Sequence, residues 1–220
     1  MNRQKSVMDD TKKTIISGIK EFFLLTILTL SAPLIIATDV LIIGHKGIPE
    51  TSVTELMQEL LLLISTVLFG LCALRIPDSR GFLVLVSGFF ACLFIRELDA
   101  YFDKIDHGFW RWPALSIAAA VITFALFCRK TVARPMADFI GTKPYYHILF
   151  GLIVLLVLSR SMGSATLLWK PIMGDAYDGA FKATLQEGLE LFGYILIGYG
   201  SFLFYRQSNH TESNEEPAAN

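Results

Sequence analysis

Acidic side chains recur at one depth of the apolar segments of this chain, where their chemistry suits the binding of a cation or a proton. The candidate metal ligands are Glu59, Glu97, Asp99, Glu187 and Glu190, with His107 of a neighbouring loop as a further one. Glu187 and Glu190 lie three residues apart, a spacing that places both carboxylates on one face of a helix. Carboxylate oxygens are hard ligands, so the pattern is typical of a site for a divalent or ferric cation.

Two arginines, Arg96 and Arg160, share this depth, and we expect them to position the carboxylates and tune their charge. With Asp39 included, six acidic side chains face these two arginines, an excess of about four negative charges if all are ionised. Unpaired charge is costly within hydrocarbon. The layer therefore predicts protonated carboxyl groups, access of water or a bound cation.

Two short strings within this layer resemble a known sequence signature. Residues 186–190, Gln-Glu-Gly-Leu-Glu, resemble the Arg-Glu-Gly-Leu-Glu motif of ferric iron permeases, and residues 96–99, Arg-Glu-Leu-Asp, are a looser version of it. In that family the two carboxylates sit on one helix face and bind the iron in transit, so the resemblance implies this chemistry for Glu187 and Glu190. Here glutamine replaces the leading arginine, the second string ends in aspartate, and six spans are predicted where the family has seven. The match covers nine residues.

Long apolar segments separated by short charged ones must position these side chains. The chain has 220 residues, of which 53% are hydrophobic and only 18% charged, whereas a soluble domain has about a quarter charged. A helix needs about 20 apolar residues to cross about 30 Å of hydrocarbon. The sequence therefore predicts an all-α polytopic membrane protein, a bundle of about six transmembrane helices. The predicted spans are residues 22–44, 53–74, 81–100, 112–128, 145–165 and 185–205.

Several predicted spans have apolar cores that are too short, which explains why charges enter the membrane. Only 15 residues separate Glu59 from Arg75, Arg80 from Arg96, Pro144 from Arg160 and Glu190 from Arg206. A helix of that length extends only about 22 Å. Arginines at the inner ends can reach water along their own stems, so the charges that enter the membrane are those at the outer ends.

The distribution of basic residues predicts the orientation. Of the 19 Lys and Arg residues, 12 lie on the side of the predicted bundle that holds both chain ends. Cytoplasmic segments are enriched in Lys and Arg, so we expect a bacterial-type inner (plasma) membrane protein with both termini cytoplasmic. Residues 1–21 are predicted as a cytoplasmic amphipathic lead, 22–205 as a single transmembrane domain and 206–220 as a disordered tail. The net charge of −1 disfavours nucleic-acid binding, and the lipid bilayer is the expected partner.

Three functions are compatible with these features. The first is an integral membrane protein whose acid-rich chamber in the outer leaflet binds or passes a cation or a proton. The second is a membrane-embedded, metal-dependent enzyme that acts on a lipid-borne substrate at the outer face, with a carboxylate as general base. The third is a structural accessory subunit whose polar layer docks another membrane protein.

Several of the charged residues also have a structural explanation. Glu55 follows Ser52 at the spacing of a helix capping box. Glu59 is equally well explained as a buried partner of an arginine, and Arg160 as the group that neutralises two carboxylates. His107 is a single loop histidine, a kind of residue that lies at the surface more often than in a metal site.

Overall fold

The computed structural model describes residues 2–41 and 52–215, and this part of the chain is helical and contains no β-strand. The α-helices are α1 (Asn2–Leu41), α2 (Val53–Arg75), α3 (Arg80–Glu97), α4 (Asp99–Phe102), α5 (Arg111–Phe127), α6 (Ala133–Ile140), α7 (Lys143–Ile153), α8 (Ser159–Met162), α9 (Lys170–Met173) and α10 (Gly179–Glu215). The segments η1 (Pro77–Ser79), η2 (Arg129–Thr131) and η5 (Gly174–Ala176) are 3₁₀-helical, and η3 (Val154–Leu158) and η4 (Ala165–Trp169) are π-helical. The predicted all-α fold is confirmed.

Within the described residues, five helical segments are long and apolar enough to cross a membrane. They are Thr11–Leu41, Val53–Arg75, Pro77–Glu97, Lys143–Met162 and Gly179–Asn209. A sixth crossing arises if α5 and Arg129–Ile140 form one span, in which case that span is bent by 97°. The chain is therefore a multi-pass membrane protein with five to six spanning helices, as its apolar segments predict.

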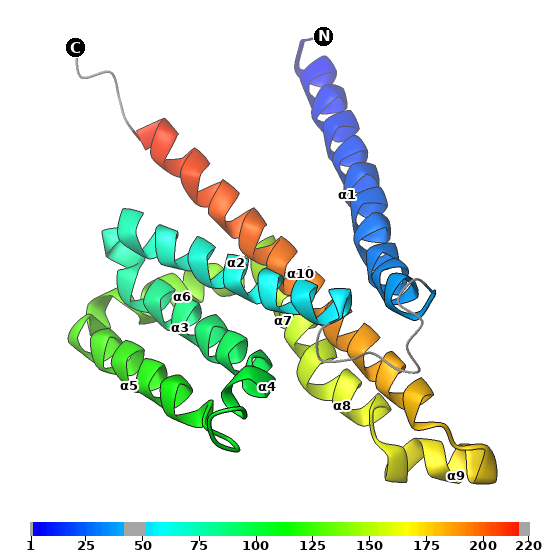
Figure 1. Ribbon diagram of the computed structural model, residues 1–220. Coiled ribbons are helices and arrows are strands. Elements are labelled where there is room, and N and C mark those ends of the chain that lie inside the picture. Colours follow the sequence, from blue (N-terminus) through cyan, green and yellow to red (C-terminus); the bar gives the residue numbers. More distant parts are fainter. Residues whose placement is uncertain (1, 42–51, 216–220) are drawn as a thin grey trace.

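The long helix α10 runs through the middle of the bundle (Figure 1). It packs against α7, α2 and α1, while α3 packs against α2 and α5. Both ends of the described chain lie on the same side of the molecule (Figure 1). This placement agrees with an even number of crossings.

Glycines allow α7 and α10 to approach each other with their backbones in contact. A Cβ atom at Gly193 would lie 2.9 Å from the carbonyl oxygen of Gly151, and one at Gly200 would lie 2.9 Å from that of Pro144. A side chain at either position would therefore force the two helices apart. Small residues have this role between membrane helices because interhelical packing there depends on close van der Waals contact.

An aromatic core fills the bundle toward the end that carries the chain termini. Phe69 of α2 stacks on Phe204 of α10, with ring centroids 5.1 Å apart. Phe139 of α6 meets both rings edge-on, at interplanar angles of 87° and 89°. These rings contain no polar atom, so the core that they form is apolar. It lies between the polar side chains described below and the end of the bundle that carries the chain termini.

Near both ends of the described chain, helix extends over more residues than the sequence predicts. The predicted lead continues without a break into the membrane-spanning part of α1, from Asn2 onward. At the other end, α10 continues through residues 206–215, which the sequence assigns to a disordered tail. The parts of the predictions that fall on residues 1, 42–51 and 216–220 lie outside the described residues.

Candidate functional site

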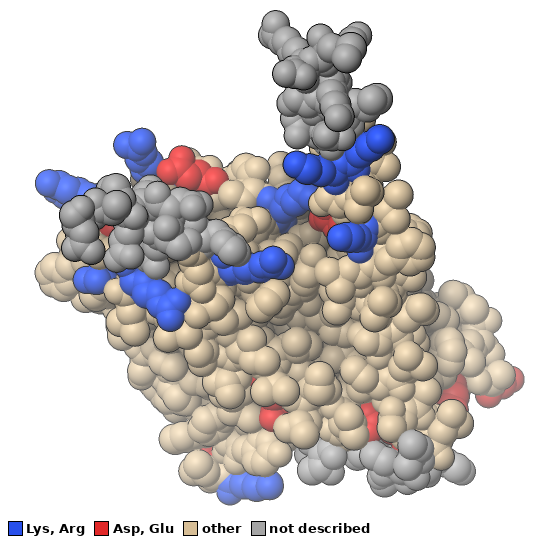
Figure 2. Space-filling model, turned by 90° about the horizontal axis from the view of Figure 1, so that it is seen from above, with Lys and Arg blue, Asp and Glu red and all other residues tan. Residues whose placement is uncertain are grey.

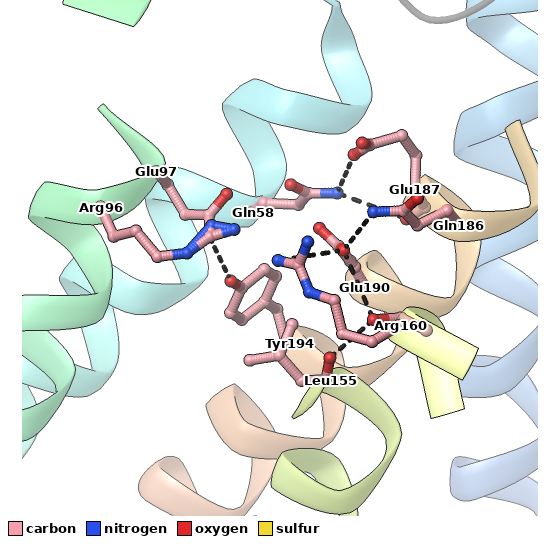
Figure 3. A network of polar contacts seen from close by, with 10 residues as sticks. Gln58, Arg96, Glu97, Leu155, Arg160, Gln186, Glu187, Glu190 and Tyr194 are labelled. Carbon is pink, nitrogen blue, oxygen red and sulfur yellow. Dashed lines mark hydrogen bonds and ion pairs between the residues drawn. The ribbon is translucent and has the colours of Figure 1, made fainter. Parts of the chain in front are cut away.

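Polar side chains from four helices meet around one face of α10, near the start of α2 and the end of α3 (Figure 3). Residues on α10 that are three, four or seven positions apart share this face. The set, called the polar network below, consists of Gln58 of α2, Arg96 and Glu97 of α3, Ser159 and Arg160 of α8, and Gln186, Glu187, Glu190 and Tyr194 of α10.

Glu97, the last residue of α3, is held by two donors. The Tyr194 hydroxyl donates a 2.7 Å hydrogen bond to Oε1 of Glu97, and Nη1 of Arg96 lies 3.0 Å from the same oxygen. The Glu97 side chain is only 10% exposed, and Tyr194 is fully buried. Hydrogen bonds to an ionised group are stronger than neutral ones, so these contacts stabilise Glu97 as a carboxylate.

Glu190 lies deeper, with only 4% of its side chain exposed. Its Oε1 accepts a 3.1 Å hydrogen bond from Nε2 of Gln186 and lies 3.5 Å from Nη2 of Arg160. The half-exposed Arg160 side chain therefore approaches the carboxylate from the outside of the bundle.

Ser159 donates within its own helical segment and only approaches Glu190. Oγ of Ser159 lies 3.4 Å from Oε1 of Glu190, and it also lies 2.6 Å from the carbonyl oxygen of Leu155. A hydroxyl has one proton to donate, and the shorter contact, to the Leu155 carbonyl, takes it. The 3.4 Å contact with Glu190 is therefore weak.

Glu187 differs from the other two carboxylates because its partner is an amide. Nε2 of the fully buried Gln58 donates to Oε2 of Glu187 at 3.1 Å and to the Glu187 carbonyl oxygen at 3.3 Å. Within the described chain, no Lys or Arg forms an ion pair with Glu187. The polar network thus holds three carboxyl groups and two guanidinium groups, which leaves one negative charge in excess if all are ionised.

The local geometry of α8 brings Ser159 and Arg160 to the network. The π-helical turn η3 separates α7 from α8, and such a turn rotates the residues that follow it relative to a regular α-helix. The backbone of Gly163, just after α8, abuts the Gln186 side chain and leaves no space for a Cβ atom. These two features place Ser159 and Arg160 of α8 next to Glu190 of α10.

Three of the predicted ligands lie outside the network. Glu59 is half-buried on α2 and forms no hydrogen bond or ion pair with the described residues. Asp99 is exposed at the start of α4. The His107 side chain is 90% exposed and contacts Asp103 of its own loop at 2.9 Å. Of the predicted ligands, the structure brings together Glu97, Glu187 and Glu190, and both predicted arginines contact one of them.

Asp39 joins α1 to α2 instead of joining the other acids. Its buried carboxylate accepts hydrogen bonds from the backbone N–H groups of Val53 and Thr54, each at 2.9 Å, and from the Thr54 hydroxyl at 2.6 Å. The first N–H groups of a helix have no partner within the helix and carry partial positive charge. Ser52 accepts from the N–H of Glu55 at 3.0 Å, as the capping pattern predicts.

Four members of the network carry no charge, and two of these, Gln58 and Ser159, do not stand out in the sequence. Gln58 directly precedes Glu59, whose charge draws attention in a sequence of apolar residues. The face of α2 that is buried carries Gln58, Leu62 and Ser65. Only the packing of α2 against α10 decides that the amide, and not the neighbouring carboxylate, enters the network.

The chemistry open to this network is the holding of charge among largely buried carboxyl groups. In the described chain, no three His, Cys, Asp or Glu side chains come close enough together to hold a metal ion. Four cavities with volumes of about 470, 530, 610 and 580 Å³ are lined by other residues. The carboxylates of the network are bonded instead by amide, guanidinium and phenol groups (Figure 3).

Comparisons of the chain with models of protein families, with characterised proteins and with solved structures find no match. The resemblance to ferric iron permeases rests on the two short strings quoted above.

Proposed function

We propose that this chain is an integral inner-membrane protein that binds a proton in the polar network, shared between Glu187 and Glu190. The observation that carries the proposal is Glu187, whose partner is the amide of the buried Gln58 and which forms no ion pair with a described Lys or Arg.

The charge balance of the network supports the same proposal. Its three carboxyl groups face two arginines, and one bound proton makes the sum zero. Excess charge within a bilayer is costly, and a carboxyl group that lacks a cationic partner lowers this cost by protonation. Glu187 and Glu190 lie one turn apart on α10, so the proposal assigns the proton to the two together.

In this proposal both chain ends lie in the cytoplasm and the polar network lies in the outer leaflet. Figure 2 views the molecule from the side of the chain ends and shows Lys and Arg side chains gathered in the upper half of the view. Enrichment of basic residues is the mark of the cytoplasmic side. Protons then reach Glu187 from the outer face, where the half-exposed Arg160 also lies.

Infrared spectroscopy of the protein in lipid vesicles tests the proposal, because a protonated carboxyl group has a carbonyl stretch that a carboxylate lacks. We expect such a band at neutral pH and its loss in both Glu187→Gln and Glu190→Gln. Glutamine preserves the shape of the side chain, and in Glu187→Gln its carbonyl oxygen can still accept the bond from Gln58. Asp99→Asn is the matched control, because Asp99 is exposed and the band should remain.

Two ion pairs, Arg96 with Glu97 and Arg160 with Glu190, favour a second candidate function. If both pairs exist only to build a stable polar layer, the chain is an accessory subunit that docks another membrane protein. In that case, the protein at neutral pH shows no protonated carboxyl band, while Glu97→Gln and Glu190→Gln both lower its stability. The metal-dependent enzyme has no comparable support, because the described residues include no group of three metal ligands.

A further inference from the structure

A groove between α1, α7 and α10 lies within the membrane-spanning part of all three helices. It has a volume of about 470 Å³ and is lined by apolar side chains that include Leu25 of α1, Phe150 and Ile153 of α7, and Phe192 and Leu196 of α10. Each of these residues belongs to a segment that is long and apolar enough to cross a membrane. The volume is in the range of about 300–1,000 Å³ found for sites of small ligands.

The end of the groove nearest the chain termini is polar and carries opposite charges. Nζ of Lys143 lies 2.6 Å from Oε2 of Glu21, and Nε2 of His147 lies 3.8 Å from Oε1 of Glu21. The His147 ring packs edge-on against Tyr199 of α10, with ring centroids 5.0 Å apart. These contacts fasten α1 to α7 at one end of the groove.

Positive charge exceeds negative charge at this rim. Arg206 lies seven residues after Tyr199, on the face of α10 where the Tyr199 ring meets His147, and so joins Lys143 and Glu21 at this rim. Two of these three groups are basic, and Lys143 remains 65% exposed although Glu21 contacts it. An apolar groove that is open along the bilayer and carries a basic rim matches a molecule with a hydrocarbon chain and a negatively charged head.

We propose that the groove between α1, α7 and α10 binds one acyl chain of an anionic phospholipid, whose phosphate contacts Lys143 and Arg206. The apolar lining accepts the chain, and the rim selects the head by charge. Glu21 weakens this selection, because it neutralises part of the charge of Lys143. The site is independent of the polar network, which lies toward the other end of α10.

A second groove provides an internal control. It lies between α1 and the first half of α10, has a volume of about 610 Å³, and is lined by residues such as Pro33, Val40 and Leu185. None of the described residues that line this second groove is charged. It should accept acyl chains without regard to the charge of the headgroup.

Quenching of tryptophan fluorescence by brominated lipids tests the proposal. Ile153→Trp reports on the first groove and Val40→Trp on the second, in a chain whose native Trp110, Trp112 and Trp169 are replaced by Phe. Each protein is placed in vesicles that contain brominated phosphatidylglycerol or brominated phosphatidylcholine. We expect the Ile153→Trp reporter to favour the anionic lipid by about fivefold, and the Val40→Trp reporter to show no preference.

Two further variants separate selection by charge from simple packing. Lys143→Gln should remove most of the preference, whereas Glu21→Gln should increase it, because Lys143 is then fully available to the phosphate. Opposite effects are expected because the two residues carry opposite charge, although both variants break the same ion pair. A purely structural role of that pair would move both variants in the same direction.

The proposal is overturned if the Ile153→Trp reporter does not distinguish the two lipids, if Val40→Trp shows the same preference, or if Lys143→Gln has no effect. Should the tryptophan-free background not fold, native mass spectrometry of the otherwise unchanged chain answers the same question. Anionic lipid should then stay bound most strongly to Glu21→Gln, less strongly to the wild-type chain and least strongly to Lys143→Gln. Equal retention by all three proteins overturns the proposal.

Discussion

The hydroxyl of Tyr194 on α10 donates a 2.7 Å hydrogen bond to the Glu97 carboxylate on α3. The main packing partners of α3 are α2 and α5, so this bond ties α3 to the central helix across the bundle. It also connects the buried carboxylate of α3 with the α10 face that carries Glu187 and Glu190. The stability of this link can be measured.

Tyr194→Phe removes the hydroxyl and leaves Glu97 with Arg96 alone. Because hydrogen bonds to charged groups contribute about 1.5–3 kcal/mol, we expect a loss of stability of that size. Reversible unfolding of the detergent-solubilised protein measures it. Tyr205→Phe is the matched control, since the Tyr205 hydroxyl accepts from Arg75 at an exposed position and its loss should change stability little.

Asp39→Asn should destabilise the start of α2. The substitution removes the charge that faces three donors of Val53 and Thr54, and loss of a helix cap costs about 0.5–2 kcal/mol. Hydrogen exchange of the first turn of α2 should become faster. Asp138→Asn, at an exposed position, should leave exchange in α2 unchanged; equal protection in both variants contradicts the capping role.

Gly193→Ala should separate α7 from α10. The new methyl group would lie 2.9 Å from the carbonyl oxygen of Gly151, and overpacking of this kind costs about 1–3 kcal/mol. A lowered thermal unfolding temperature is the expected result. Gly141→Ala serves as the control because a methyl group at that position would meet nothing within 4 Å; an equal effect of both substitutions would argue against close packing at Gly193.

Gln58 and Glu187 should be coupled energetically. A double-mutant cycle with Gln58→Leu and Glu187→Leu is expected to give an interaction free energy of about 0.5–3 kcal/mol, the range for residues in direct contact. In the control cycle with Glu187→Leu, Glu59→Leu replaces Gln58→Leu. Because Glu59 forms no bond with the network, its coupling to Glu187 should be close to zero.

The chemical types of the site residues are visible in the sequence, but their grouping is not. Glu187 and Glu190 share a helix face by spacing alone, and the structure places both in the network. Asp39, Asp99 and Glu59 are also acidic and have a similar predicted depth. In the structure, however, Asp39 caps α2, Asp99 is exposed, and Glu59 forms no bond with the network. Depth along a helix follows from residue counts, whereas the direction of a side chain depends on which neighbour the helix meets.

The sequence by itself determines that this chain is a multi-pass helical membrane protein with acidic residues near one end of its helices. Hydrocarbon leaves no partner for free backbone groups, so long apolar segments must become helices. Only the tertiary structure decides which polar groups meet, because contacts between α2, α8 and α10 depend on helix rotation, on the π-helical turn before α8 and on glycines that allow close approach. These features bring the neutral side chains of Gln58 and Ser159 to Glu187 and Glu190 and thereby create the network.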